Sequence, residues 1–578
     1  MRRRTGAAAA PHAGPSPPRE PAPTIDLEAA GSTPILREYR AVKAEHPGAI
    51  VLARLGDFYE MFGDDAERAA PLLGVTLTGR GFGSAGRLPM CGVPHHSATQ
   101  HVRRLLGAGL RVVLWDQVGG PDEAAETTGR ALVRRDVTRI LTPGTLLDDD
   151  FLEASTAVRC VALAPRPGRV GVAALDVSTG DLQLAECPGG LETAGLAEEL
   201  DRLAAAELLL PEGIEVGDGM AASAPRTRVP PAHFDAARGE ERLRDLAGVA
   251  TLRGLGADAM PAAHAAAAAL LAYCERSRIA LDAGFVRVRT RPNAEGMRLD
   301  APTRRNLELT ASPGGAGGLV VLLDRTVTPM GARLLREELL LPLTRARAIE
   351  GRLDGVEALV RSRDARRRLR DALRPIRDLE RLCGRCVQRL ASPRDLAALA
   401  TGLSALDEVR AAARSIAAAP GGDGTPAPEV LETAAATATA PDGLVARLRA
   451  TLVDDPPATT RDGGAVRPGA DAVLDSLVAA GAGAREYIGS LEDAERVRTG
   501  IRSLRVGYNR VFGYYLEVPN AHRSAVPGEW VRKQTLVGAE RYVTDKLREQ
   551  EAVVLGSRDR ALAREVEILA ELAAVVAA

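Results

Sequence analysis

The sequence predicts a multidomain protein that joins α/β regions to a long all-α region. The chain has 578 residues, 46% of them hydrophobic, which is too much for one core and fits roughly three to five domains. Mixed helix and strand patterns fill the first half, and long stretches with helical apolar spacing begin near residue 266. Together these observations favour a mixed α/β and helical fold class.

The N-terminal part is expected to hold a tail and a first α/β domain. Residues 1–31 are rich in Ala, Pro and Gly and should form a disordered tail. The domain is expected over residues 32–150. In it, PILREYRAVKAEH has helical spacing, AIVLARLGDFYEMF reads as one strand, and PHHSATQHVRRLLGAGLRVVLWDQV reads as helix, glycine stop and strand.

A second α/β domain is expected over residues 151–265, with a hairpin in RVGVAALDVSTGDLQLAEC around Thr179-Gly180, an alanine-rich helix and the strand AELLLP. A helical scaffold is expected over residues 266–455, because stretches such as ARAIEGRLDGVEALVRSRDARRRLRDAL combine helical spacing with charge pairs four residues apart. Segments 415–428 and 454–470 are rich in Pro, Gly and Asp and should break it.

Strand patterns return in SLRVGYNRVFGYYLEVP and EWVRKQTLV, so a strand-containing domain is expected over residues 456–538. A helix is expected to return over 539–578, beginning with AERYVTDKL. It carries no glycine cap, basic last turn or proline near Ala578, so the sequence is expected to stop inside a helix.

Composition argues against several classes of protein. The net charge is −1, so only a local basic face could attract a polyanion. The six cysteines are scattered, no signal-peptide core follows the N-terminal arginines, and no run reaches the roughly 18 apolar residues of a membrane span. We expect a soluble, cytoplasmic protein with reduced thiols. Cys383 and Cys386 form a C-x-x-C, yet no second ligand pair accompanies them, so a structural role is favoured over zinc.

The segment GDFYEMF carries the most specific chemical signal. If residues 51–62 form a strand, side chains alternate, which places Arg54, Phe58 and Glu60 on one side. The other side is the natural core face and holds Val51, Leu55, Tyr59 and Met61. An exposed aromatic beside a carboxylate is a candidate for stacking on a base, although periodicity alone favours an ordinary half-buried Phe58.

A second signal is local charge. From Arg498 to Arg548 the chain has ten Lys or Arg against four acids, with aromatic residues interleaved. Such a patch suits contact with a phosphate backbone without sequence readout. A solvated basic face is the alternative that the residues leave open.

At this level of detail the chain resembles the MutS family. GDFYEMF is similar to that family's Phe-x-Glu motif, and further matches follow in the family's order as far as the C-terminus: LPMCGVPHHS, RRDVTRILTPGTL, ALDVSTGDLQL, RRNLELT, LLDRTVTPMGARLLREELLLPL, RDGGAVRPGADAVLD, GYNRVFGYYLEV and RKQTLVGAERYVTDKL. The resemblance implies a mismatch-binding domain, an RNase H-like connector, a helical lever and a clamp domain inserted in that lever.

The resemblance also implies a function, which is recognition of mismatched or looped-out base pairs by wedge insertion and bending, at the start of DNA mismatch repair. Phe58 would wedge beside the mismatch and Glu60 would hydrogen-bond the displaced base. Arg532, Lys533 and Arg541 would contact the backbone of the duplex from the clamp. Relatives usually have a basic or polar pair where this chain has Val537-Gly538, so the resemblance does not extend to contact through that tip.

The expected partners are mismatched double-stranded DNA, a MutL-type repair protein and, for the full-length protein, a second copy in a homodimer. No membrane association is expected, and the expected location is near the nucleoid. Family members use ATP with magnesium, which requires a P-loop lysine after glycine. The three lysines here follow Val42, Arg532 and Asp545. No cofactor is therefore expected in this chain, and the family's ATPase domain is expected only in a longer protein.

Two alternatives remain. A MutS-like protein could bind recombination structures rather than mismatches, although the Phe-x-Glu motif favours repair. An RNase H-like nuclease could use Asp176, which ends a strand in ALDVSTGDLQL. The residues argue against this nuclease hypothesis, because two-metal cleavage needs several clustered carboxylates and no clear second and third acid follows.

Overall fold

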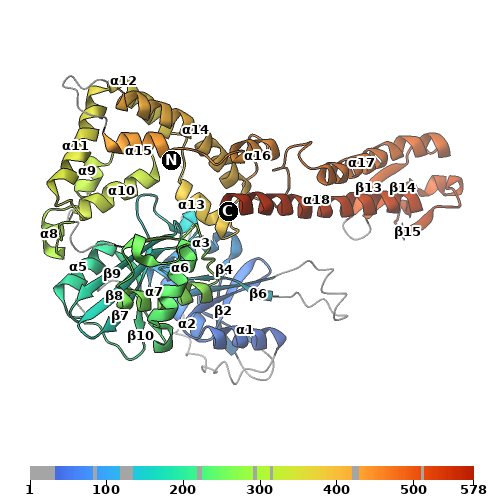
Figure 1. The fold of residues 1–578 in the computed structure, drawn as a ribbon. Helices are drawn as coiled ribbons and strands as arrows, with labels where there is room; N and C mark the ends of the chain where they lie inside the picture. Colours follow the sequence, from blue (N-terminus) through green and yellow to red (C-terminus); the bar gives the residue numbers. More distant parts are fainter. Residues whose placement is uncertain are drawn as a thin grey trace, which may run out of the picture. The chain divides into compact units, whose positions relative to one another are not determined.

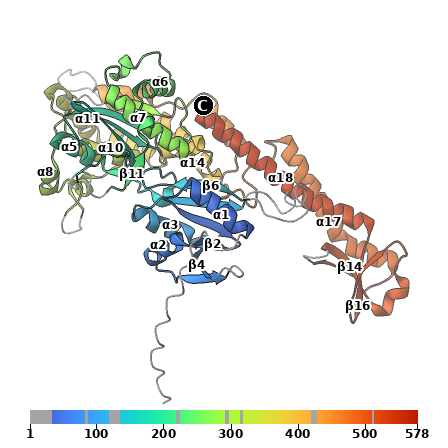
Figure 2. The same ribbon diagram turned by 90° about the horizontal axis from the view of Figure 1, so that it is seen from below.

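The computed structural model describes residues 33–81, 87–117, 135–217, 224–290, 296–312, 317–418, 428–509 and 513–578. The tail expected at 1–31 lies outside these residues. The chain divides into two compact units, Met1–Pro143 and Gly144–Ala578, shown as ribbons in Figures 1 and 2. Among the described helices, none combines the length and the apolar character that a bilayer span requires.

The first unit is built on a six-stranded sheet with the order β3-β4-β2-β1-β5-β6. Its strands are β1 Ile50–Leu55, β2 Phe58–Phe62, β3 Thr78–Gly81, β4 Arg87–Pro94, β5 Val112–Gln117 and β6 Arg135–Leu141. Its helices are α1 Pro34–Glu45, α2 Asp64–Leu73 and α3 Ala98–Gly107. The expected helix at 34–46 and the expected helix, stop and strand at 94–118 are confirmed.

The single strand expected over AIVLARLGDFYEMF is wrong. The segment forms two antiparallel strands, β1 and β2, with Leu55 opposite Phe58. The turn between them contains Gly56 with φ +60°, a left-handed conformation that glycine adopts without steric cost. The alternation of side chains therefore restarts at Phe58 instead of continuing from β1.

A buried carboxylate holds β1 against the helices of this unit. Asp65, in the first turn of α2, accepts hydrogen bonds from Tyr39 Oη at 2.8 Å and from the backbone N–H of Val51 at 3.0 Å. Lys43 lies 2.5 Å from the same carboxylate. Burial and the neighbouring Asp65 raise the pKa of Tyr39. The contacts satisfy a charge that would otherwise be costly to bury, and they fix α1 over β1.

The second unit begins with another six-stranded sheet, in the order β11-β10-β7-β8-β9-β12. The expected hairpin is confirmed, since Asp176 lies opposite Asp181 and Gly180 has φ +71° in the turn. The strands are β7 Arg159–Arg166, β8 Arg169–Asp176, β9 Asp181–Pro188, β10 Ala205–Pro211, β11 Arg226–Val229 and β12 Arg287–Thr290. Three helices accompany them: α5 Ala194–Leu203, α6 Ala236–Ala247 and α7 Pro261–Arg276.

Helix α7 packs closely on this sheet, because a Cβ at Gly171 of β8 would lie only 2.0 Å from the backbone of Ala262. The boundary expected between residues 265 and 266 falls inside α7. Helices then dominate, as expected: α8 Ala301–Asn306, α9 Leu319–Leu323, α10 Pro329–Leu340, α11 Ala346–Arg361, α12 Arg363–Leu373, α13 Leu379–Val387, α14 Pro393–Ala417, α15 Glu429–Thr437 and α16 Leu444–Thr451.

The C-terminal part of the second unit pairs two long helices, α17 Ala472–Thr499 and α18 Asp545–Ala577, which run side by side in Figure 1. Between them the chain forms the C-terminal sheet, with the order β13-β14-β16-β15. Its strands are β13 Arg505–Asn509, β14 Gly513–Pro519, β15 Val531–Thr535 and β16 Ala539–Val543. The helix expected from residue 539 is wrong over 539–543, because these residues pair with both β14 and β15.

All six cysteines are free thiols. Cys383 and Cys386 lie one turn apart on α13, where Cys386 is buried in a core shared with α14 and α18. Burial raises the pKa of Cys386 to about 12, so this thiol stays protonated. Across the described ranges, no group of three His, Cys, Asp or Glu is arranged to hold a metal ion.

Candidate nucleic-acid interface

The β1–β2 hairpin presents Phe58 at the surface of the first unit. Phe58 is the first residue of β2 and is 48% exposed, whereas Tyr59, Met61 and Phe62 of the same strand are buried. The turn before it is held on both sides. Arg54 donates from Nε to the carbonyl of Gly56 at 2.7 Å, and the backbone N–H of His95 donates to the carbonyl of Asp57 at 2.8 Å. The exposed ring therefore stands on an ordered turn.

Glu60 shares a face with Phe58, as alternation within β2 predicts. Arg54 does not. It lies directly opposite Tyr59, so its side chain is on the other face, with its guanidinium carbon 5.8 Å from the Tyr59 ring centroid. Leu55, expected beside Tyr59, is opposite Phe58 instead. The turn at Gly56 caused both errors, because it reverses the chain between the two strands.

The buried side of the hairpin is anchored through Tyr59. Its hydroxyl donates to Asp116 Oδ1 on β5 at 2.6 Å, and its ring centroid lies 5.5 Å from that of His95. Burial, together with the bond to Asp116, raises the pKa of Tyr59 well above its ordinary value. These contacts fix β2 in the sheet, so the strand would resist displacement when a ligand contacts Phe58.

The C-terminal sheet has a core face and an outer face. On the core face, Leu516, Val518 and Tyr542 are buried against α17 and α18. Cross-strand pairs put Arg505, Glu517 and Arg541 in one row on the outer face, since directly opposite residues project from the same side. Gln534 of β15 extends the row opposite Arg541.

The guanidinium of Arg541 is held in place on this outer face. Its Nε donates to Glu517 at 3.0 Å and its Nη1 to Gln534 at 3.0 Å, and its carbon lies 4.1 Å from the Tyr515 ring centroid. Tyr515 occupies this position because its partner is Gly507, where a Cβ would come within 2.6 Å of the ring. Among the described residues, Nη2 of Arg541 has no hydrogen-bond partner, and a guanidinium N–H can donate to an anion such as a phosphate.

The three basic residues expected to act together are not on one face. Arg532 lies opposite Tyr542 and pairs with the buried Glu540 at 3.3 Å, as does Arg523. A hydrogen bond from Tyr542 and these two arginines lower the pKa of Glu540.

Lys533 sits in an irregularity of β15 between Arg532 and Gln534, and it is exposed without an ion pair to any described residue. Val537 at the adjoining tip is fully exposed, at 104%.

Sequence reasoning missed the contribution of Arg505 to the outer face. Arg505 belongs to the basic segment of the sequence, but only the pairing of Arg505 with Glu517, and of Glu517 with Arg541, brings it into the row. The alternation Arg505-Val506-Gly507 could have indicated an outward-facing arginine. Its distance of more than thirty positions from Arg541 in the chain concealed the cross-strand relation.

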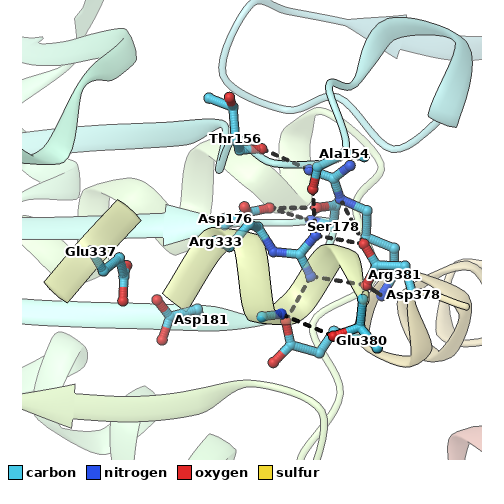
Figure 3. A network of polar contacts seen from close by, with 12 residues as sticks. Ala154, Thr156, Asp176, Ser178, Asp181, Arg333, Glu337, Asp378, Glu380 and Arg381 are labelled. Atoms are coloured by element: carbon cyan, nitrogen blue, oxygen red, sulfur yellow. Dashed lines mark hydrogen bonds and ion pairs between the residues drawn. The ribbon is translucent and has the colours of Figure 1, made fainter. Parts of the chain in front are cut away.

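Asp176, the proposed nuclease acid, has a structural role (Figure 3). It is 1% exposed and accepts hydrogen bonds from Ser178 Oγ at 2.6 Å, Ser178 N at 3.0 Å and Val158 N at 3.2 Å. Burial raises its pKa, while Ser178 and the nearby Arg381 oppose that change. A carboxylate enclosed in this way offers no open position for a metal ion, which disfavours the nuclease alternative.

Arginines from two helices close over this end of the sheet, as Figure 3 shows. Arg381 of α13 donates to the carbonyls of Glu153 at 3.0 Å and Thr156 at 2.8 Å. Arg333 of α10 donates to Asp378 Oδ1 and to Glu380, each at 2.8 Å. The network ties the second α/β region to the helices that follow it.

Comparison with known proteins identifies the family of this chain. Three family models match in order: MutS domain I over residues 33–150, MutS domain II over residues 158–280 and MutS domain III over residues 302–578. The chain belongs to the MutS family. In MutS terms, the exposed Phe58 lies in domain I, and the C-terminal sheet with Arg541 lies in domain III.

Full-chain relatives agree with the MutS assignment. A protein named DNA mismatch repair protein MutS from Anaeromyxobacter dehalogenans is 42% identical over 559 residues, covering 94% of this chain and 60% of the relative. The proteins of the same name from Myxococcus xanthus and Thermodesulfovibrio yellowstonii are 38% and 34% identical, with 95% and 93% of this chain covered. The chain spans about 60% of the length of the curated relatives it matches.

Proposed function

We propose that this MutS-family chain recognises mismatched or looped-out base pairs in duplex DNA by inserting Phe58 beside the mispaired base and bending the duplex, as the first step of DNA mismatch repair. The observation that carries the proposal is the exposure of Phe58, which is 48% exposed at the start of β2. Buried residues that follow it in the same strand hold β2 in the sheet. An aromatic ring that projects from the surface of a firmly held strand is suited to insertion between bases.

The energetics of base stacking explain how a wedge could discriminate. Inserting an apolar side chain at a base step costs a few kcal/mol in lost stacking. That cost is lower where the base is already mispaired. Glu60 lies on the same face as Phe58, and its carboxylate would accept a hydrogen bond from a base edge that offers a donor. In a matched duplex no base would be displaced, so no base edge would donate a hydrogen bond to the Glu60 carboxylate.

The outer face of the C-terminal sheet is proposed to contact the phosphate backbone. Arg541 offers a positioned guanidinium, Arg505 adds charge in the same row, and Lys533 is exposed beside it. Contacts of this type hold a duplex without reading its sequence. Arg532, which pairs with Glu540 on the other face, would add to the local positive potential more than to a direct contact.

The remaining features of the full-length family are also proposals here: a homodimer, recruitment of a MutL-type protein, and a cytoplasmic location near the nucleoid. ATP with magnesium is proposed to act only in a longer protein. The residues here do not suit a phosphate-binding loop, since the lysines Lys43, Lys533 and Lys546 follow Val, Arg and Asp instead of glycine.

The test compares binding to a G·T duplex, a single-base-loop duplex and a matched duplex by fluorescence anisotropy, with bending followed by energy transfer between end labels. Phe58→Ala should reduce the preference for the mismatch by about tenfold or more and abolish the change in end-to-end distance. Leu77→Ala is the matched control, since Leu77 is 46% exposed in the same unit. Equal discrimination by Phe58→Ala and the wild-type chain would refute the wedge.

A further inference from the structure

The surface around Glu60 is formed by two cross-strand rows on β1, β2 and β4. Ala53, Glu60 and Gly92 form one row, and Leu55, Phe58 and Pro94 form the next. Directly opposite residues in antiparallel strands project from the same side, with Cβ atoms about 5 Å apart. Glu60 therefore stands between a methyl group and a bare backbone. Phe58 beside it stands between two larger side chains.

Neither backbone conformation nor local crowding requires glycine at position 92. Its φ lies outside the positive range that L-residues avoid. A Cβ built there would meet the Tyr59 carbonyl oxygen at 3.4 Å and Glu60 Cγ at 3.6 Å, which are ordinary contacts. Glycine in a strand interior lowers strand stability and often marks a place where a ligand comes close to the backbone. The open space beside Glu60 is then the feature that glycine provides.

In the part of the chain that the structure describes, the neighbouring strand β3 does not extend across from Gly92. β3 pairs with β4 only from Arg87 to Met90, so Gly92 and Pro94 lie past the end of that pairing. On the other side of Glu60, Ala53 is buried and packs in the core with Trp115. Among the described residues, the sheet surface next to Glu60 is therefore less covered on the Gly92 side than on the Ala53 side.

We propose that Gly92 is a specificity-determining residue for mismatch recognition: its missing side chain admits the displaced base to Glu60. The inference rests on the proposed function. A hydrogen bond to the carboxylate needs a donor about 2.7–3.2 Å away. A branched side chain at 92, about 5 Å from the Cβ of Glu60, occupies the space through which a planar base reaches that distance. Phe58 could still insert, but the carboxylate would no longer be reached.

The experiment measures dissociation constants for G·T and matched duplexes with Gly92→Ala, Gly92→Val and Gly92→Leu. Gly92→Ala should stay within about twofold of wild type, because its methyl group makes only ordinary contacts. Gly92→Val and Gly92→Leu should weaken mismatch binding about tenfold while leaving matched binding unchanged. Valine is a good strand former, so it provides a second variant if leucine disturbs folding, which urea denaturation would reveal.

A double-mutant cycle separates blocking of Glu60 from a merely structural effect. In a Glu60→Ala background, Gly92→Val should cause little further loss, because the blocked group is already absent. Additive losses, or equal weakening of matched and mismatched binding, would overturn the inference. Undiminished mismatch preference in Gly92→Val, alongside its loss in Phe58→Ala, would overturn the role of Gly92 alone. A wild-type chain without mismatch preference would overturn the proposed function and this inference with it.

Discussion

The guanidinium carbon of Arg541 lies 4.1 Å from the centroid of the Tyr515 ring, on the outer face of the C-terminal sheet. Glu517 and Gln534 accept hydrogen bonds from two of the guanidinium nitrogens. A planar cation on an aromatic face is attracted by the ring quadrupole, and its hydrogen bonds fix the direction of the remaining N–H groups. Arg541 is therefore ordered before any ligand arrives.

A first prediction concerns this arginine. Arg541→Gln should weaken matched and mismatched duplexes equally, by about fivefold, and should reduce the slope of log affinity against log salt by about one, because one phosphate contact is lost. Anisotropy titrations at several salt concentrations measure both quantities. Arg532→Gln is the control, since Arg532 pairs with Glu540 on the other face. A larger effect in the control would contradict the assignment of the outer face.

A second prediction concerns the contact between β8 and α7. Gly171→Ala should destabilise the second unit by about 3 kcal/mol, because the added Cβ would lie 2.0 Å from the backbone of Ala262. Urea denaturation followed by circular dichroism measures the change. Gly254→Ala provides the matched control, because a Cβ there meets nothing within 4 Å. Equal midpoints for the two variants would show that α7 does not pack as closely as described.

A third prediction concerns the arginine network of Figure 3. Arg333→Met should lower the free energy of unfolding by about 2 kcal/mol, since it removes the charge-assisted hydrogen bonds that a largely buried guanidinium donates to Asp378 and Glu380. The two carboxylates keep Arg381 and Arg287 as partners. Arg361→Met removes an exposed ion pair with Glu357 and should cost about 0.5 kcal/mol or less. Chemical denaturation of both variants tests the difference, and a loss in Arg333→Met no greater than in the control would count against the network.

A fourth prediction concerns pH and the C-terminal sheet. The hydrogen bond from Tyr542, with Arg523 and Arg532, holds the pKa of Glu540 below its ordinary value of 4.5. A lowered pKa contributes stability that is present above pH 4.5 and is lost as pH falls toward the folded-state value. Wild type should lose stability more steeply than Glu540→Gln as pH falls from 5 to 3.

Trp530 provides the readout for that pH experiment, because it is buried in the core beneath the same sheet. The chain has two tryptophans, so a Trp115→Phe background assigns the fluorescence to Trp530. Thermal unfolding at each pH gives the comparison between wild type and Glu540→Gln. Parallel pH profiles would show that the ion pairs of Glu540 do not contribute to the stability of the sheet.

Local pattern predicted many elements correctly, and for identifiable reasons. The hairpin at Thr179-Gly180 follows from a turn glycine between alternating strands, and α1 from helical spacing after Thr33-Pro34. Alternation within a single strand places Phe58 and Glu60 on one face. The errors came from neighbouring segments. Gly56 split one expected strand into two, and pairing with β14 and β15 made 539–543 a strand despite its helical spacing.

The sequence by itself determined the family through ordered motifs and the shared face of Phe58 and Glu60 through alternation within one strand, because both depend on residues close together in the chain. Tertiary structure alone decided that Arg541 shares a face with Arg505 and not with Arg532. It also decided that Gly92 lies opposite Glu60 and that Arg381 closes over the region of Asp176. These relations depend on strand register and helix packing between distant segments, which a reading of local periodicity does not contain.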